Sequence, residues 1–131
     1  MRCVLIYNPA SGRKRSLRTE QVRQVADALS SLGHQVDVAA TTAPGSATDQ
    51  ARQAVVGGAD VVFACGGDGT MHEVLHGLVS ESGARGAALG IIPLGSENAL
   101  ARHLRISLDP IKAALQQIHS SAQTIPLGKI V

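Results

Sequence analysis

The sequence predicts an α/β fold in which a mostly parallel sheet lies between two layers of helices. Short apolar runs alternate along the chain with longer segments whose apolar residues recur every three to four positions. Each apolar run ends in a stretch rich in Gly, Pro, Ser, Thr or Asn. The 131 residues suffice for one domain, and strand-helix alternation favours parallel pairing because a helical crossover returns the chain to the same end of the sheet.

Residues 2–7 form the first predicted strand, an apolar run that ends at Asn8-Pro9-Ala10-Ser11-Gly12. The next apolar residues fit one face of a helix. Gly33 is expected to end this helix, because glycine accepts the left-handed conformation that often follows a helix. The predicted inner face consists of Val22, Val25, Ala26, Leu29 and Leu32.

A second strand is predicted around Val36 and Val38, which alternate with polar residues until residues 41–45 break the chain. Ser46 is expected to cap the next helix, and Gly57-Gly58 to end it. The small side chains on this helix suggest close packing against a neighbour. They are Ala47, Ala51 and Ala54, with Val55 beside them.

The central strand is predicted at residues 61–65, which are apolar on both faces and lead into Gly66-Gly67-Asp68-Gly69. A helix follows directly, since Thr70 and Glu73 have the spacing of a capping box. Its expected apolar stripe is Met71, Val74, Leu75, Leu78 and Val79.

A fourth strand is predicted at residues 87–92, followed by a short helix at about 97–104. Asp109 as N-cap and Pro110 at the first helical position predict one more helix, and residues 124–131 are strand-like again. The inner face of this last helix is expected to be Ile111, Ala114, Leu115 and Ile118.

These elements together predict a Rossmann-like three-layer sandwich with right-handed crossovers. Sheets of this kind bind ligands beyond the carboxyl ends of their strands. Residues 66–70 join the buried central strand to a helix N-terminus, where free N–H groups and the helix dipole favour a phosphate. Thr70 adds a hydroxyl, and Asp68 is a candidate for holding Mg²⁺. The alternative interpretation is a tight turn without a ligand.

Several common motifs are absent from the sequence. The third glycine of a dinucleotide-binding fingerprint is replaced by His72. No Gly-Lys-Ser/Thr of a Walker A loop and no Gly-x-Ser-x-Gly of a hydrolase elbow occurs.

Three segments in this order resemble the diacylglycerol kinase catalytic family, which includes sphingosine, ceramide and bacterial lipid kinases. The segments are Asn8-Pro9-Ala10-Ser11-Gly12, Gly66-Gly67-Asp68-Gly69-Thr70-Met71-His72-Glu73 and Pro93-Leu94-Gly95-Ser96-Glu97-Asn98. The resemblance implies the nucleotide-binding α/β domain of an ATP-dependent lipid kinase over residues 1–123, with Mg²⁺ as cofactor and ATP or ADP as ligand. Asp68 is then the catalytic residue, organising metal and phosphate. The implied nucleotide-binding residues are Asn8, Thr41, Gly66, Gly67, Asp68, Gly69, Thr70, Met71, His72, Glu73 and Ser96.

The sequence departs from the family pattern at several positions. His72 stands where asparagine is common. Ser96, Glu97 and Ala99 give Gly-Ser-Glu-Asn-Ala where many members have Gly-Thr-Gly-Asn-Asp, so a frequent aspartate is replaced by Ala99. The resemblance also implies a β-rich C-terminal domain that supplies the lipid pocket and a catalytic acid. Residues 124–131 resemble only the start of the crossover to it.

Composition restricts the alternatives. A net charge of +2 and an aromatic content of 2% argue against nucleic-acid binding. No apolar run approaches the roughly 20 residues of a membrane span, and Met1 leads directly into a strand pattern. We therefore expect a cytoplasmic protein, with peripheral contact at the inner membrane surface as an option. Cys3 and Cys65, inside apolar runs, are expected to be reduced thiols.

Two questions stay open at this level. The basic residues between Arg13 and Arg18 could meet phosphate, an anionic membrane or only solvent. An NAD kinase-like enzyme, which shares the Gly-Gly-Asp-Gly segment, and a non-catalytic nucleotide-binding module remain alternatives to the lipid kinase.

Overall fold

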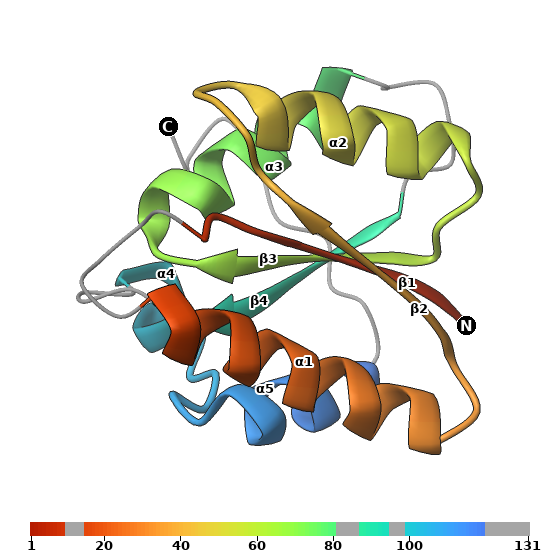
Figure 1. The fold of residues 1–131 in the computed structure, drawn as a ribbon, viewed down its shortest axis with the longest axis vertical. Coiled ribbons are helices and arrows are strands. Elements are labelled where there is room, and N and C mark those ends of the chain that lie inside the picture. Colours follow the sequence, from red (N-terminus) through yellow and green to blue (C-terminus); the bar gives the residue numbers. More distant parts are fainter. Residues whose placement is uncertain (10–14, 81–86, 95–98, 120–131) are drawn as a thin grey trace.

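A computed structural model describes residues 1–9, 15–80, 87–94 and 99–119 of the chain. Strands and helices alternate in the predicted order (Figure 1). The elements are β1 (Arg2–Tyr7), α1 (Arg15–Ser31), β2 (Gln35–Ala40), α2 (Ser46–Val56), β3 (Val61–Gly66), α3 (Asp68–Ser80), β4 (Ala88–Pro93), α4 (Ala99–His103) and α5 (Pro110–Ile118). The strand-like segment 124–131 and the residues between 95 and 98 lie outside the described residues.

The described strands form one parallel sheet in the order β2-β1-β3-β4. Leu5 in β1 pairs with Val38 of β2 on one side and with Phe63 of β3 on the other. The chain therefore moves outward from β1 to β2 and then returns across β1 to begin β3. This reversal makes the gap between the carboxyl ends of β1 and β3 a topological switch point, where sheets of this type bind ligands.

Helices cover both faces of the sheet, so the predicted three-layer α/β sandwich is confirmed (Figure 1). On one face α1 packs beside α5, and on the other α2 packs beside α3. Right-handed crossovers require this distribution, because the chain advances in opposite directions before and after β2.

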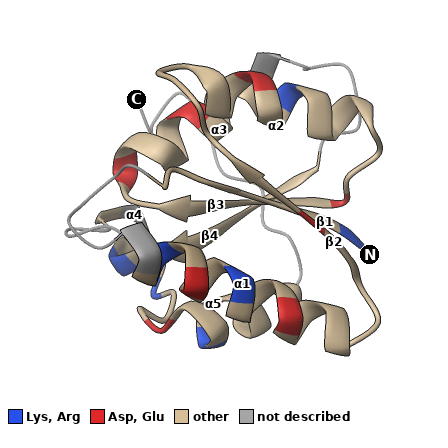
Figure 2. Ribbon diagram, in the orientation of Figure 1, with Lys and Arg blue, Asp and Glu red and all other residues tan. Residues whose placement is uncertain are grey.

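Charged residues lie mainly on the outer surfaces of the helices and near the amino-terminal ends of the strands (Figure 2). At that end of the sheet the backbone N–H of Arg2 donates to the Asp60 carboxylate at 2.8 Å. The guanidinium of Arg2 lies 3.9 Å from the Asp37 carboxylate. These exposed contacts are at the amino-terminal ends of the strands, and the predicted ligand site is at the opposite, carboxyl ends.

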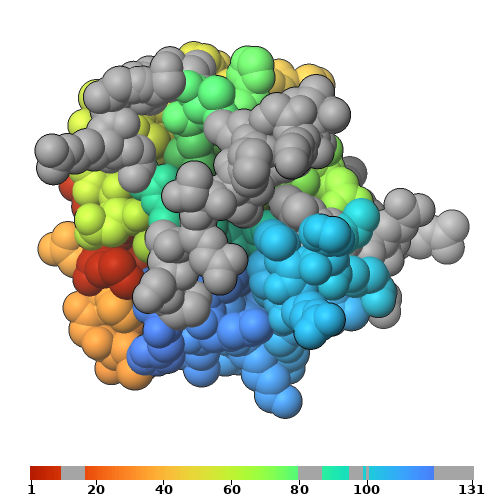
Figure 3. All heavy atoms as spheres, turned by 180° about the vertical axis from the view of Figure 1, so that it is seen from behind, coloured from red at the N-terminus to blue at the C-terminus, as the bar shows by residue number. Residues whose placement is uncertain are grey.

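Residues 99–119 lie together on the face seen in Figure 3, where they are coloured cyan to blue. Gln116 of α5 ties the preceding turn to the helix, since its side-chain amide donates to the Arg105 carbonyl and accepts from the Ser107 N–H. None of the helices within the described ranges has the length and apolar character that crossing a bilayer requires.

In the described part of the chain, β4 forms one edge of the sheet, and a side chain of α5 covers part of that edge. The Gln117 amide accepts from the Ile91 N–H at 2.7 Å and donates to the Ile91 carbonyl at 2.6 Å. A single side chain thus makes the pair of hydrogen bonds that a neighbouring strand would make.

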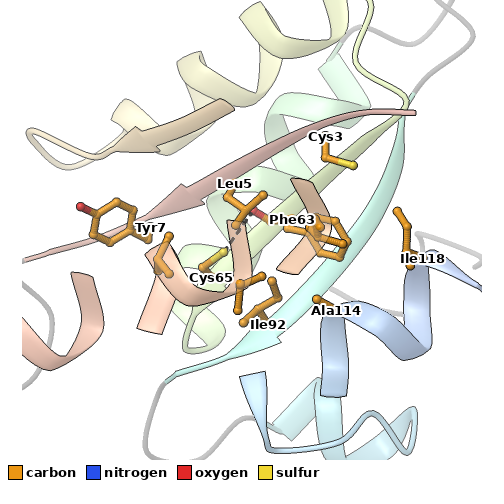
Figure 4. Close-up of a cluster of buried hydrophobic side chains, with 11 residues drawn as sticks. Cys3, Leu5, Tyr7, Phe63, Cys65, Ile92, Ala114 and Ile118 are labelled. Carbon is orange, nitrogen blue, oxygen red and sulfur yellow. Dashed lines mark hydrogen bonds between the residues drawn. The ribbon is translucent and has the colours of Figure 1, made fainter. Parts of the chain in front are cut away.

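The core under α1 and α5 is centred on Phe63, which is fully buried (Figure 4). Its ring occupies the space above Gly90 of β4, where an added Cβ would lie 2.3 Å from a ring carbon. Cys3 and Cys65 are buried free cysteines on this face, so the prediction of reduced thiols is confirmed.

The core under α2 and α3 contains smaller side chains, which confirms the predicted close packing. A Cβ added to Gly77 of α3 would lie 2.3 Å from the Thr48 carbonyl oxygen and 2.8 Å from the Ala51 Cβ in α2. The two helices can approach this closely only because position 77 has no side chain.

The ends of two helices agree with the sequence prediction. The carboxylate of Asp109 accepts the N–H of Lys112 at 3.0 Å, as an N-cap does. Gly33 has a φ of 92°, in the left-handed region expected after α1.

Two predicted helix caps are wrong. The N-cap of α2 is Gly45, and the Ser46 hydroxyl instead accepts the N–H of Thr42 at 3.0 Å. The predicted capping box fails because α3 already begins at Asp68, which places Thr70 inside the helix. The Glu73 carboxylate accepts the N–H of Gly45, from a different loop.

Two predicted members of apolar stripes are also wrong. Leu32 is 49% exposed because α1 ends one residue before it. Val79 is 41% exposed, and Gly77 takes the position against α2 instead.

Candidate nucleotide site

A cavity of about 330 Å³ opens where the carboxyl ends of β1 and β2 meet the start of α3. It lies at the carboxyl edge of the sheet, beside the topological switch point. Residues from three separate segments line it: Asn8, Thr41, Thr42, Ala43, Pro44, Thr70 and Glu73.

The sheet itself brings the first two segments together. Beyond the last residue of β2, the Thr41 N–H donates to the Tyr7 carbonyl at 2.8 Å, which extends the parallel ladder by one step. Asn8 follows Tyr7 directly, so two residues that are 33 positions apart lie at the same rim of the cavity.

The loop at residues 41–45 forms one wall of the cavity and is held by several hydrogen bonds. The Ser46 N–H donates to the Ala43 carbonyl at 3.1 Å, and the Ser46 hydroxyl accepts from Thr42. Gly45 has a φ of 85°, which other residues rarely adopt, and its N–H donates to Glu73 Oε1 at 2.9 Å. The wall is therefore bonded both within itself and to α3.

On the other side the cavity is lined by Thr70 and Glu73 of α3, next to the turn from β3 into this helix. A Cβ at Gly66 would lie 3.0 Å from the Thr70 hydroxyl oxygen, so glycine is needed where the strand meets the helix. The Gly66 carbonyl accepts the N–H of Leu94 at 3.1 Å, which joins the turn to the end of β4. The first N–H groups of α3 have no partners within the helix, as at every helix start.

Asp68 lies in the first turn of α3, and its Oδ2 accepts the N–H of Ala99 at 3.3 Å. The carboxylate thus links the starts of α3 and α4. Within the described residues no three His, Cys, Asp or Glu side chains gather closely enough to hold a metal ion alone. Mg²⁺ bound to a nucleotide needs only one or two protein carboxylates, because phosphate oxygens and water complete its shell, so Asp68 fits that role.

Residues 2–130 match the family described as diacylglycerol kinase catalytic domain. The chain belongs to this family. The match covers all four strands and all five helices of the described structure, and therefore the whole candidate site.

Similar proteins carry the same family name. The chain is 37% identical over 130 residues to a diacylglycerol kinase of Bacillus subtilis (strain 168), and 33% identical over 129 residues to one of Staphylococcus saprophyticus. These alignments cover 98% of this chain but 42% and 41% of the two relatives, so it spans about two-fifths of their length. A crystal structure of a diacylglycerol kinase from Bacillus anthracis str. Sterne superposes with a TM-score of 0.73 and 26% identity, over 90% of this chain and 40% of that one.

The resemblance to the diacylglycerol kinase family implies eleven nucleotide-binding positions. Some of them line the cavity, some adjoin it and others lie elsewhere. Asn8, Thr41, Thr70 and Glu73 line the cavity. The glycines of the Gly-Gly-Asp-Gly segment and Asp68 form the adjoining turn. The remaining positions are Met71, whose side chain is 5% exposed in the apolar core, His72, which is exposed at the surface, and Ser96, which lies outside the described residues.

Sequence reasoning missed part of the wall. Thr42, Ala43 and Pro44 line the cavity but were predicted only as a chain break. The signal that could have found them was their position directly after a strand, at the edge where ligands bind.

Arg18 of the basic segment contacts the protein itself. Its guanidinium, partly buried, donates to the Leu94 carbonyl at the end of β4. The side chains of Arg13, Lys14 and Arg15 lie outside the described residues, so the choice between phosphate, membrane and solvent stays open for them.

Proposed function

We propose that this chain is the nucleotide-binding domain of an ATP-dependent lipid kinase. The enzyme would transfer the γ-phosphate of ATP to the hydroxyl of a diacylglycerol-like or sphingoid lipid. The observation that carries the proposal is the cavity between the 41–45 loop and the start of α3, in a chain of the diacylglycerol kinase catalytic domain family. A lipid acceptor resides in a bilayer, so we also propose peripheral contact with the inner membrane surface.

The start of α3 supports phosphate binding. Its N–H groups and the positive end of its dipole favour an anion. A Cβ built on Gly69 meets nothing within 4 Å, so the backbone there is open to a ligand. Thr70, which lines the cavity, offers a hydroxyl beside these N–H groups.

Asp68 would hold Mg²⁺ together with the nucleotide phosphates. When bound, Mg²⁺ would neutralise charge on the phosphate oxygens during transfer. Because Asp68 Oδ2 accepts from Ala99, the carboxylate is held at the α3 start, where a metal or a phosphate-bound water is the natural partner. This placement suits charge organisation better than removal of a proton from a lipid hydroxyl.

We assign the lipid pocket and the general base to a further part of the full-length enzyme. Phosphoryl transfer depends on holding the acceptor oxygen in line with the γ-phosphate, which requires a second wall facing the nucleotide. That this chain spans about two-fifths of the length of its diacylglycerol kinase relatives supports such a division.

A nucleotide titration tests the proposal. We expect Mg-ATP and Mg-ADP to bind with dissociation constants of about 0.1–1 mM, which corresponds to a binding free energy of roughly 4–5.5 kcal/mol. The largest amide shifts in a two-dimensional NMR spectrum should fall on residues 67–70 and 41–45. A folded sample whose spectrum stays unchanged at several millimolar nucleotide would exclude the proposed site.

A further inference from the structure

We propose that Glu73 is a positioning residue whose carboxylate holds the 41–45 loop in the shape that forms one wall of the cavity. Its function as a nucleotide wall rests on the proposed function, whereas the positioning itself concerns this chain alone. The carboxylate accepts a hydrogen bond across the cavity, from a loop that lies 28 residues earlier in the sequence.

The geometry of the contact explains why it acts on the loop. Glu73 Oε1 accepts the N–H of Gly45 at 2.9 Å, and Gly45 is the N-cap residue of α2 with a φ of 85°. No side chain caps the α2 N-terminus from within its own loop. The carboxylate therefore fixes the residue at which the wall turns into the helix.

The backbone of Glu73 is itself bound to α2. Its own carbonyl accepts the Thr48 hydroxyl at 2.8 Å, so the same residue binds α2 through its backbone. One turn later Gly77 packs directly on the Thr48 carbonyl. Because α2 and α3 pack so closely at Gly77, we expect the distance from Glu73 to Gly45 to be kept even without the Thr48 bond.

A carboxylate suits this position for electrostatic reasons. A charged acceptor makes a stronger hydrogen bond to a backbone N–H than a neutral one. The N-terminus of α2 also carries the positive end of that helix's dipole. If the bond is lost, we expect the loop to sample other shapes, and the ligand affinity is then multiplied by the fraction of molecules in which the wall is formed.

The test compares three variants in the nucleotide-free and nucleotide-bound protein. In Glu73→Ala, we expect amide hydrogen exchange of Gly45 to accelerate by about tenfold or more, and Mg-ADP binding to weaken by about five- to tenfold. Glu73→Gln keeps an acceptor oxygen at the same reach. We expect it to retain protection of Gly45 and to bind Mg-ADP within about threefold of the wild type.

Thr48→Val is the matched control, because it removes the second contact of Glu73 with α2 and leaves the carboxylate bond to Gly45 in place. We expect Gly45 exchange and Mg-ADP affinity close to the wild type in this variant. Unchanged Gly45 exchange in Glu73→Ala would overturn the proposal. So would Glu73→Gln binding as weakly as Glu73→Ala while Gly45 stays protected, since charge alone would then matter.

The exchange measurement needs no ligand, so it separates the two proposals. If the wild-type protein binds no nucleotide, the proposed function fails while Gly45 exchange still decides the positioning role. If nucleotide binds but Gly45 exchange is independent of Glu73, only the positioning role fails.

Discussion

At the scale of single residues, Asp68 has two contributions: a structural hydrogen bond and a proposed chemical role. Its Oδ2 accepts the Ala99 N–H, a bond that an uncharged amide oxygen could also accept. What an amide cannot supply is the negative charge with which Asp68 would attract Mg²⁺ under the proposed function. The two contributions can therefore be separated by one substitution.

We predict that Asp68→Asn lowers the kcat/KM of the full-length kinase by more than tenfold, a loss of at least about 1.4 kcal/mol in transition-state stabilisation. The free energy of unfolding should stay within about 0.5 kcal/mol of the wild type, because the bond to Ala99 is kept. Asp49→Asn is the matched control, since Asp49 pairs with Arg52 at 3.1 Å on an exposed helix surface. Activity above a tenth of wild type in Asp68→Asn would remove the assigned role.

Cys65 provides a second prediction at this scale, on the pH dependence of stability. Burial raises the pKa of the Cys65 thiol far above its ordinary value of 9.0, with the backbone hydrogen bond to Ile6 acting weakly in the opposite direction. Above pH 9 the thiol ionises in the unfolded chain but stays protonated in the folded one. The unfolded state then binds fewer protons, so stability falls as the pH rises.

We expect the Cys65 thiol to lower the free energy of unfolding by about 1.4 kcal/mol between pH 8 and pH 10, as measured by urea denaturation. Cys65→Ala is less stable at both pH values because it leaves a cavity, but its loss between them should be smaller by about that amount. Cys3, whose thiol pKa burial also raises, remains in both proteins as an internal reference. Equal losses in the two proteins would contradict the prediction.

At the scale of elements, two glycines of α3 have opposite surroundings. Gly77 faces α2 so closely that any side chain would meet the Thr48 backbone, whereas a Cβ at Gly69 meets nothing within 4 Å. Gly69 lies in the first turn of α3, where helix propensity matters less than it does at Gly77 further along the helix. A loss of stability on substitution of Gly77 would therefore come from packing between α2 and α3.

We predict that Gly77→Ala lowers the free energy of unfolding by about 1–3 kcal/mol, because the two helices must move apart. Gly69→Ala should leave stability unchanged or raise it by up to about 1 kcal/mol, since alanine favours the helix. The same Gly69 variant should weaken Mg-ADP binding if phosphate approaches the α3 start. Thermal denaturation of both variants measures the first two effects, and a stable Gly77→Ala protein would show that the interface can relax.

The sequence predicted these elements well but not the contacts between them. Apolar periodicity located the strands and helices because burial of one face is a local pattern. It also predicted α3 correctly from the glycines at its start. It could not predict that Glu73 binds Gly45. The spacing of Thr70 and Glu73 fits a capping box, and nothing in the local sequence shows that the Glu73 carboxylate reaches a distant loop instead. The predicted burial of Leu32 was wrong for a similar reason, since the apolar periodicity continues past Ser31, where α1 ends.

At the scale of the whole molecule, the candidate site is a property of the strand order. Asn8, Thr41 and Thr70 meet because β1, β2 and β3 are neighbours whose carboxyl ends share one edge. That convergence could be predicted from the alternation of elements. The order β2-β1-β3 and the bond between Asp68 and Ala99 could not, because both depend on which segments pack together in space.

We predict that residues 1–131 bind nucleotide but transfer no phosphate to lipid. The acceptor must be held in line with the γ-phosphate, and such positioning accounts for roughly 7–11 kcal/mol in well-oriented reactions. The measurement is radiolabel transfer from ATP to mixed diacylglycerol, sphingosine and phospholipid acceptors, with the full-length enzyme as the positive control. Label in lipid at a rate near that of the full-length enzyme would place the whole catalytic apparatus within this chain.

The hydrogen bonds of Gln117 to Ile91 also bear on self-association. A strand edge with free N–H and carbonyl groups is a template on which another chain can add by β-augmentation. On the described β4, an incoming chain would first have to displace an amide that already satisfies both groups of the central residue. The covering group is anchored on a helix that packs against α1, so it stays in place as long as the tertiary structure does. We therefore expect Gln117 of α5 to hinder the addition of another strand at Ile91 of the β4 edge.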